Sequence, residues 1–256
     1  MHSKLAGVLI LLAAACVPSR TEPGSAVVTA GPFSPTAFLD KYVMTVEAQQ
    51  HHPRTVSMDV DMDADLPQLK KHGRFHAFRF ITRVGQIFYD RRRYEGDSTI
   101  KKEVIGRYLQ AEKQARSEYS ASLAVIPANY KFKYQGVTNY ADRVAYVFQV
   151  TPRQKRVGLY KGELWIDRDT YLPLREWGEL TKNPSVFLKN VYFVRDYAIC
   201  DGVSVPRRLI SDISTRLFGK AHLTIWYKNF SVGDATTATA DLDVPAPSSQ
   251  ADGGYH

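Results

Sequence analysis

The chain has 256 residues and a net charge of +8, with 44% hydrophobic and 23% charged residues. This length suits one large domain or two small ones, and the composition is that of an ordinary globular protein. The basic balance favours an anionic membrane surface or nucleic acid as a partner. The Lys and Arg residues stand in short scattered groups, which we expect at solvated strand ends. Because no nucleic-acid-binding motif accompanies them, we exclude nucleic acid as a partner and retain an anionic membrane surface.

The N-terminal residues predict export. Lys4 precedes an apolar run from Leu5 to Ala15, which is too short to cross a bilayer comfortably and is typical of a cleaved signal peptide over residues 1–15. Two modes of cleavage fit the residues that follow. The three alanines before Cys16 suit ordinary signal peptidase, and Leu12-Ala-Ala-Ala-Cys16 also resembles a bacterial lipobox, in which the cysteine is acylated and becomes the first residue.

The lipobox interpretation predicts a periplasmic protein anchored by a lipid on Cys16, and the alternative is a soluble periplasmic protein. Val17, rather than Asp, follows the cysteine, which by resemblance to lipoproteins generally directs the protein to the outer membrane. The other cysteine, Cys200, is expected to be a small buried residue in a strand.

The chain divides into three parts after the signal peptide. Residues 16–35 are rich in Pro, Gly, Ser and Thr and predict a flexible tether, whereas residues 233–256 are poor in core-forming residues and predict a disordered tail. Residues 36–232 are expected to form the folded domain.

The folded part begins with a helix over residues 36–50, capped by Ser34 or Thr36, which ends before Pro53. Its apolar stripe consists of Phe38, Leu39, Tyr42, Val43 and Val46. A strand follows over residues 55–66, in which residues 56–63 alternate strictly between Val or Met and Ser or Asp. Residues 74–96 contain two further strands.

A second amphipathic helix, opened by Asp97 or Ser98, is expected over residues 98–121, with Ile100, Val104, Ile105, Tyr108 and Ala111 on its apolar side. After it the pattern stays strand-like. The expected strands cover residues 130–138, 143–151, 160–167, 172–180, 185–197, 203–214 and 221–232, joined by short turns such as Asp201-Gly202.

Sequential strands with tight turns form an antiparallel meander, so the predicted fold class is α+β, mostly β. Nine or ten strands against two helices predict a strongly curled antiparallel sheet, a half-open β-barrel, whose concave face the two helices cover. Alternation along three strands selects the residues expected to face this cavity: Tyr146, Phe148, Leu164, Ile166, Leu223, Ile225 and Tyr227.

Several chemical sites can be tested against the sequence. A calcium loop that starts at Asp59 would need Gly and Glu where Ala64 and Lys70 stand, and His72 and His76 lack the helix and the Glu of a zinc pair. We therefore expect no metal and no cofactor. Asp167 and Asp169 stand at a strand reversal, where Asp is favoured, and we expect them to shape an exposed corner rather than to catalyse. No nucleophile or phosphate-loop motif is present, so no enzymatic activity is predicted.

Three segments carry a resemblance to a known family. "YKGELWIDRDTYLPLREWGEL" (residues 160–180), "VRDYAICDGVSVPRRL" (194–209) and "GKAHLTIWYKNF" (219–230) resemble the LolA-like superfamily of bacterial outer-membrane lipoprotein-sorting proteins, which includes LolB and the sensor domain of RseB/MucB. The resemblance covers residues 35–232. It implies a half-open barrel that binds the acyl chains of lipoproteins, or related lipids, in its concave apolar face.

The sequence therefore leads to a periplasmic protein that binds lipid or acyl chains and takes part in lipoprotein or lipid traffic at the outer membrane. The alternative is an RseB/MucB-like sensor module that binds a lipidated or misfolded envelope protein and regulates a partner. A third interpretation is an uncharacterised hydrolase.

Overall fold

The first helix begins where the sequence analysis places it. In the computed structural model, which describes residues 33–51, 54–83, 86–117, 123–183 and 188–233, helix α1 spans Pro35–His51. Ser34 is its cap: its Oγ accepts a hydrogen bond from the Ala37 backbone N–H at 3.3 Å. From the predicted stripe Phe38 and Tyr42 are buried, and the other members are partly buried against the same core.

The second helix is interrupted. It consists of α2 (Ser98–Ile100), a π-helical segment (Lys101–Gly106) and α3 (Arg107–Ser117), and the last residues of the predicted helix lie outside the described part. Asp97 caps it, since its carboxylate accepts a hydrogen bond from the Thr99 N–H at 2.7 Å. The wider turn of the π segment leaves two consecutive residues, Val104 and Ile105, buried together with Ile100.

Ten strands follow the predicted pattern of runs and turns. Their bounds are β1 Thr55–Leu66, β2 Lys71–Ile81, β3 Ile87–Gly96, β4 Tyr130–Tyr140, β5 Arg143–Pro152, β6 Tyr160–Asp167, β7 Pro173–Leu180, β8 Leu188–Cys200, β9 Val203–Thr215 and β10 Lys220–Gly233. Strand β8 continues to Cys200, three residues beyond the predicted end, because the reversal occurs only at Asp201 and Gly202. Both residues have the positive φ that a tight hairpin turn requires.

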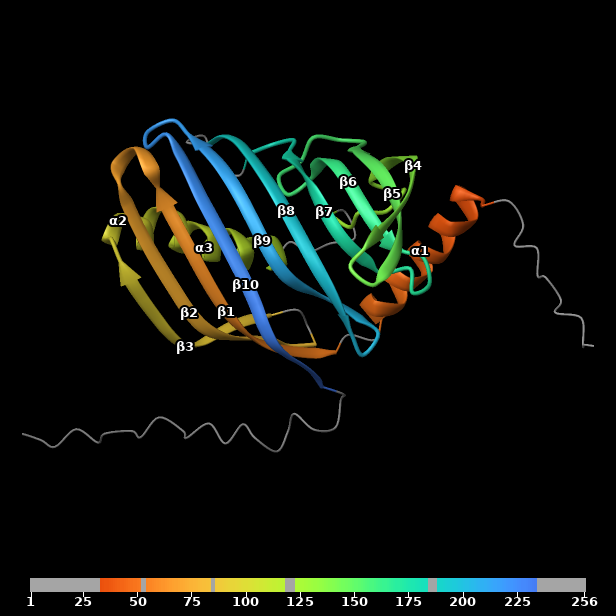
Figure 1. Cartoon of the computed structure of the whole chain (residues 1–256), viewed down its shortest axis with the longest axis horizontal. Coiled ribbons are helices and arrows are strands. Elements are labelled where there is room, and N and C mark those ends of the chain that lie inside the picture. The colour runs from red at the N-terminus through yellow and green to blue at the C-terminus, as the bar shows by residue number, and fades with distance from the viewer. Residues whose placement is uncertain (1–32, 52–53, 84–85, 118–122, 184–187, 234–256) are drawn as a thin grey trace, which may run out of the picture. The chain divides into compact units, whose positions relative to one another are not determined.

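All ten strands form one antiparallel sheet in the order β3-β2-β1-β10-β9-β8-β7-β6-β5-β4 (Figure 1). The predicted meander holds from β4 to β10, and the pairing of β1 with β10 attaches the first three strands. The sheet is open, with β3 and β4 as its edge strands. The prediction of an α+β, mostly β fold with an antiparallel sheet and two helical segments is confirmed.

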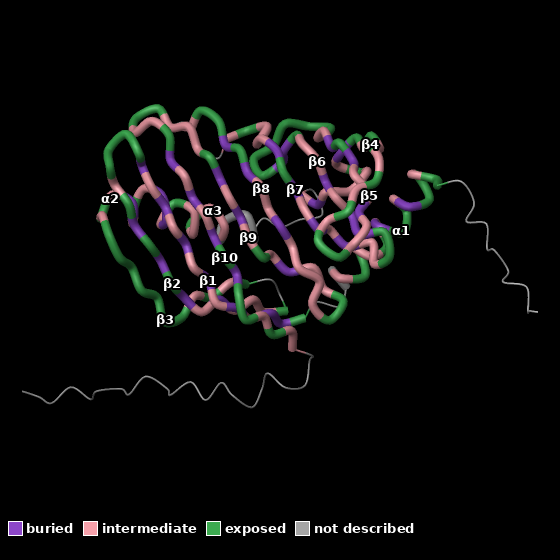
Figure 2. The backbone as a smooth tube through the Cα atoms, in the orientation of Figure 1, coloured by how far each residue is buried: buried purple, intermediate pink, exposed green. Residues whose placement is uncertain are grey.

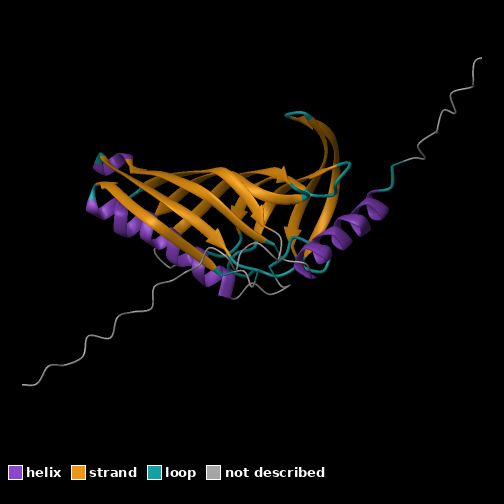
Figure 3. Ribbon diagram, turned by 90° about the horizontal axis from the view of Figure 1, so that it is seen from below, coloured by secondary structure: helices purple, strands orange, loops and turns teal. Residues whose placement is uncertain are grey.

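Both helical segments lie on the same side of the sheet (Figure 3). Buried residues alternate with more exposed ones along the strands, as β1 and β2 show in Figure 2. Strand alternation thus gives the sheet a helix-covered face, which carries the core, and an outer face, which meets solvent.

Candidate functional site

The seven residues predicted to line a cavity all lie on the helix-covered face. Strand pairing places Tyr146 opposite Ile166 and Phe148 opposite Leu164, so these four side chains form one group. Six of the seven residues are at most 5% exposed, and Tyr146 is partly buried against the same core. The structure therefore brings them into one apolar cluster, and the two helical segments cover different parts of it.

Helix α1 covers the group on β5 and β6. The Phe38 ring meets the ring of Tyr146 edge-on at 4.7 Å between centroids and lies 6.1 Å from that of Phe148. One turn further, the Tyr42 hydroxyl donates to the Val125 carbonyl at 2.9 Å. Aromatic rings, rather than ion pairs, therefore hold this helix on the sheet.

The α2–α3 segment covers the group on β10, which contains Leu223, Ile225 and Tyr227. Ile100 and Ile105 are fully buried in the same core cluster. The hydroxyl groups of Tyr108 and Tyr227 lie 3.3 Å apart, within hydrogen-bonding distance. This half of the face combines aliphatic packing with polar contacts.

A buried ion pair anchors α3 to the sheet. Arg79 of β2, 2% exposed, donates from its guanidinium to the Glu112 carboxylate at 2.8 Å, and the Tyr89 hydroxyl donates to the other oxygen of that carboxylate. Burial is the largest single influence and works against the charge on Arg79, but Glu112 and the surrounding tyrosines together outweigh it and raise the arginine's pKa. Burial and the same carboxylate raise the pKa of Tyr89. Both groups therefore remain donors to Glu112 at neutral pH.

A second polar group separates the two apolar halves of the face. On β7 and β8, Arg195 donates to Glu176 at 3.1 Å and to the Tyr197 hydroxyl at 3.3 Å. The Arg195 side chain is 39% exposed although it lies on the helix-covered face, whereas Glu176 is 9% exposed. The predicted apolar face is thus crossed by a charged pair that water can reach.

Sequence reasoning missed these polar residues, although the alternation contained the signal. Arg79 follows Phe75 and Ala77 at spacings of two, and Arg195 follows Phe193 in the same way, so both occupy positions that point toward the core. A charged residue at an inward position predicts a buried partner. The partners could not be named, because Glu112 lies 33 residues from Arg79 in the chain.

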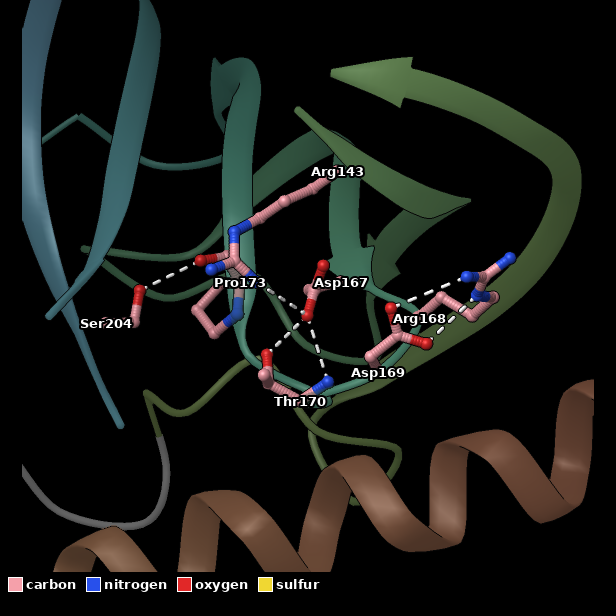
Figure 4. A network of polar contacts seen from close by, with 7 residues as sticks. All are labelled: Arg143, Asp167, Arg168, Asp169, Thr170, Pro173 and Ser204. Carbon is pink, nitrogen blue, oxygen red and sulfur yellow. Dashed lines mark hydrogen bonds and ion pairs between the residues drawn. The ribbon is translucent and has the colours of Figure 1, made fainter. Parts of the chain in front are cut away.

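Asp167 forms the reversal after β6. The prediction that this residue lies at an exposed corner is wrong. Asp167 is 1% exposed, because Arg143 from β5 lies over it at 3.3 Å and the turn folds Thr170 against it (Figure 4). Its Oδ2 accepts from the Thr170 N–H at 2.9 Å and from the Thr170 hydroxyl at 2.6 Å. These contacts support the interpretation of Asp167 as a turn-forming residue, but a buried one.

Asp169 remains at the surface, as expected. It is 67% exposed and pairs with the neighbouring Arg168 at 3.0 Å (Figure 4). On the following strand, Pro173 accepts a hydrogen bond from Ser204 through its carbonyl at 2.8 Å. The two aspartates thus stand in different environments, but each one is engaged in contacts within the turn.

Three further sites can be placed. Cys200 is a free thiol at the end of β8 and is partly, not fully, buried, while Cys16 lies outside the described residues. Among the residues that the structure describes, no three His, Cys, Asp or Glu side chains are grouped as a metal site would need. In the same residues no helix has the length and apolar character to span a membrane.

The comparisons with known proteins agree with the resemblance seen in the sequence. A family model of the MucB/RseB N-terminal domain matches residues 96–181, which run from the end of β3 through β7. The resemblance to the LolA-like superfamily, which includes the RseB/MucB sensor domain, is therefore confirmed over this third of the chain. Among curated proteins none matches.

Solved structures that are similar to this chain include the following three. A putative outer-membrane lipoprotein-sorting protein domain from Vibrio parahaemolyticus is 12% identical, with a TM-score of 0.42 over 78% of this chain and 94% of its own. A LolA superfamily protein from Nitrosomonas europaea is 13% identical, with a TM-score of 0.37 over 79% and 95%. The MucA/MucB complex from Pseudomonas aeruginosa is 14% identical, with a TM-score of 0.26 over 75% and 93%.

The two aspartates of the turn should differ in their contribution to stability. Asp167→Asn removes a buried charge that Arg143 and Thr170 stabilise, so we expect the free energy of unfolding to fall by about 1–3 kcal/mol. The matched variant Asp169→Asn loses only an exposed ion pair and should change it by less than about 0.5 kcal/mol. Urea unfolding measures both. Equal losses in the two variants would contradict the burial of Asp167.

Buried tyrosines predict a loss of stability at alkaline pH. Burial raises the pKa of Tyr89, Tyr108 and Tyr160 in the folded protein, whereas tyrosines of the unfolded chain ionise near pH ~10. Their contribution is complete below that pH and is lost as the pH rises above it, by up to about 1.4 kcal/mol per pH unit for each tyrosine. Urea titrations between about pH 8 and about pH 11 measure the free energy of unfolding, which should decline less steeply with pH in Tyr89→Phe than in the parent chain. An unchanged slope would count against this account.

Proposed function

We propose that this protein is an exported, periplasmic acyl-chain-binding protein that takes part in lipoprotein or lipid traffic at the outer membrane. The observation that carries this function is the large apolar cluster on one face of a single open sheet, which the Glu176–Arg195 pair crosses and which helical segments cover at its two ends. A sheet that curls as a half-open barrel around this cluster would enclose an acyl chain once a helix moves aside.

The residues that would contact the chain are Tyr146, Phe148, Leu164, Ile166, Leu223, Ile225 and Tyr227. Six of them are buried under helices, so in this proposal helical side chains would have to give up the place that the acyl chain takes. Each methylene of an acyl chain that replaced these contacts would contribute about 0.8 kcal/mol. Binding is therefore an exchange of one apolar partner for another.

Helix α1 is the segment that we expect to move. Its contacts with the rest of the protein are mainly apolar, through Phe38, Tyr42 and the partly buried aliphatic residues of its stripe. Exposed hydrogen bonds add to them, from Lys41 to the Tyr171 hydroxyl and from Gln49 to the Gly202 carbonyl, both at 3.2 Å. The α3 segment is held instead by the buried Arg79–Glu112 pair, and removal of one partner from such a pair costs about 3–5 kcal/mol. An acyl chain can replace aromatic packing far more readily than it can replace a buried ion pair.

We place the protein at the periplasmic side of the outer membrane, held by a lipid on Cys16 and a tether over residues 16–35. A soluble periplasmic form is the alternative. An anchor of this kind would keep the acyl-binding face close to lipid, and the length of the tether would allow it to approach the bilayer in several orientations.

The alternative function is a sensor module that binds an envelope protein and regulates a partner. The match of residues 96–181 to the MucB/RseB N-terminal domain favours it. The same apolar face would then hold the lipid of a lipidated partner or an exposed apolar segment of a misfolded one. Recovery of a stoichiometric envelope protein with the purified chain, absent from a Phe148→Asp variant, would favour the sensor over the carrier.

Acyl probes of increasing length test the binding function. Affinity should rise by about fourfold for each added methylene until the site is filled. Ile166→Asp places a charge against the chain and should weaken binding by more than tenfold, because the carboxylate must be desolvated. Phe38→Ala should strengthen it, because the ring that competes for the same surface is removed. Fluorescence titration gives the dissociation constants.

The control in this series is Asp169→Asn, which lies in the turn beside Ile166 and should bind as the parent chain does. Circular dichroism identifies any variant that fails to fold. If Ile166→Asp is unfolded, Phe38→Ala still tests the proposal. Probe affinity that is independent of chain length, or that Phe38→Ala lowers, would rule out the helix-covered face as the site.

Lipidation of Cys16 has a separate test. Metabolic labelling with a fatty-acid probe should mark the parent chain and should leave Cys16→Ser unmarked, because the thiol is the acceptor. The same variant should move from the membrane fraction to the soluble periplasm. Equal soluble recovery of both forms would instead indicate cleavage by ordinary signal peptidase.

A further inference from the structure

The positive charge of the chain is concentrated in one hairpin. Residues 70–96 contain eight Lys or Arg residues against two Asp or Glu residues, a net charge of +6, whereas the whole chain carries +8. This segment forms β2 and β3 at one end of the sheet (Figure 1). Arg79 is buried with Glu112, but the three arginines of residues 91–93 are exposed.

The outer face of the same hairpin carries three phenylalanines. Phe75 and Arg79 of β2 point toward the helices, so Phe78 and Phe80, at the alternate positions, point outward. Strand pairing sets Phe88 of β3 opposite Phe80, and Phe88 is 53% exposed. Aromatic side chains therefore gather on a surface that already has excess positive charge.

A β-bulge places the arginines beside these rings. The register of β2 and β3 shifts between His76 and Phe78, and Arg91 there adopts a left-handed backbone with φ 50°. Its guanidinium lies over the Phe78 ring, 4.9 Å from the centroid. Arg91, Arg93, His76, Phe78 and Asp59 line a hollow of about 140 Å³.

Within the described ranges, these arginines lack strong partners. Arg92 and Arg93 form no ion pair in the part of the chain that the structure describes, and Arg91 approaches only the exposed Asp90, at 3.8 Å. Asp59, the acidic residue in the hollow, is engaged by the Asn229 side chain at 2.7 Å. The hollow can therefore offer guanidinium groups to an external anion such as a phosphate.

Trp165 and Trp177, also on the outer face, form hydrogen bonds within the protein, and arginines on this face form ion pairs. Trp165 and Trp177 both donate their indole N–H to Glu163, at 3.0 Å and 2.9 Å. Arg175 and Arg208 both pair with the buried Asp196. Open positive charge beside exposed aromatic rings thus distinguishes the β2–β3 hairpin from the surroundings of Trp165 and Trp177.

We infer that Phe78, Phe80, Phe88, Arg91 and Arg93, here called the β2–β3 patch, dock the protein on the surface of a bilayer that contains anionic lipid. Lipid phosphates would occupy the arginine-lined hollow, and the phenylalanine rings would enter the interfacial layer, where aromatic and basic residues together are favoured. A purely electrostatic site for an acidic protein would not require three outward phenylalanines.

This inference goes beyond the proposed function, and the two can fail separately. The patch lies on the outer face, whereas the acyl site lies on the helix-covered face, so a variant of one leaves the other intact. Docking through this surface would also leave α1, the helix expected to move, free of the bilayer contact.

Co-sedimentation with lipid vesicles tests the docking surface. The full chain carrying Cys16→Ser is used, so that no acyl group can hold it on the vesicle. We expect binding to vesicles of phosphatidylcholine with phosphatidylglycerol and little binding to phosphatidylcholine alone. The double variant R91Q/R93Q should bind the anionic vesicles roughly 30-fold more weakly, since each arginine near such a surface contributes about 1 kcal/mol.

The matched control is K131Q/K133Q, which removes the same charge from exposed positions on β4, at the opposite edge of the sheet, and should bind as the parent does. Phe88→Ser should weaken binding about fivefold at low salt and should leave the salt dependence unchanged. Circular dichroism checks that each variant is folded. If R91Q/R93Q is unfolded, Phe88→Ser still tests the docking surface.

Several outcomes would overturn the inference. They are equal binding of R91Q/R93Q and the parent chain, equal loss in R91Q/R93Q and K131Q/K133Q, and equal binding to neutral and anionic vesicles. Complete competition by millimolar inorganic phosphate would identify a small-anion site instead. Binding to polyglutamate without binding to vesicles would identify an acidic protein partner.

Discussion

The architecture depends on the pairing of the first strand with the last. Strand β1 runs antiparallel to β10, from Thr55 opposite Gly233 to Asp65 opposite His222. Without it, the described strands would separate into a hairpin extended by β1 and a meander from β4 to β10, because no other pairing joins the two parts. Loop closure over most of the chain must precede this pairing, so the protein is expected to fold slowly for its size.

The same pairing decides which residues share the helix-covered face. It aligns Met62 with Ile225 and Val60 with Tyr227, and β2 then adds Arg79 beside Met58. Where α3 covers the resulting surface, Glu112 meets Arg79 and so provides the partner that this buried charge needs. A pair of this kind adds little net stability over apolar residues but penalises any arrangement that leaves one charge unpaired. It therefore fixes where α3 lies, whereas the aromatic contacts of α1 do not fix that helix in the same way.

Much of the fold could be predicted from local patterns. The stripe of α1, the alternation of β1 and the Asp201-Gly202 reversal all depend on neighbours in sequence, and each appears where expected. The burial of Asp167 could not be predicted, because Arg143 comes from the preceding strand and the pattern beside a turn does not reveal what covers it. Alternation along each strand was enough to select the apolar cavity residues. The Glu176–Arg195 pair between them could not be predicted, because its two members come from different strands.

The sheet separates two kinds of chemistry, and the bulge in β3 shows how. Tyr89 and Tyr94 both pack against Phe75 on the helix-covered side, at 6.0 Å and 4.7 Å between ring centroids. They are five positions apart, and in a regular strand an odd separation would place them on opposite faces. The extra residue of the bulge, with Arg91 in a left-handed conformation, places both tyrosines on the helix-covered face and turns Arg93 outward beside His76. A regular strand would place one of the two tyrosines on the outer face and direct arginine toward the apolar cluster. The backbone irregularity therefore keeps positive charge on the outer face and the apolar cluster on the other.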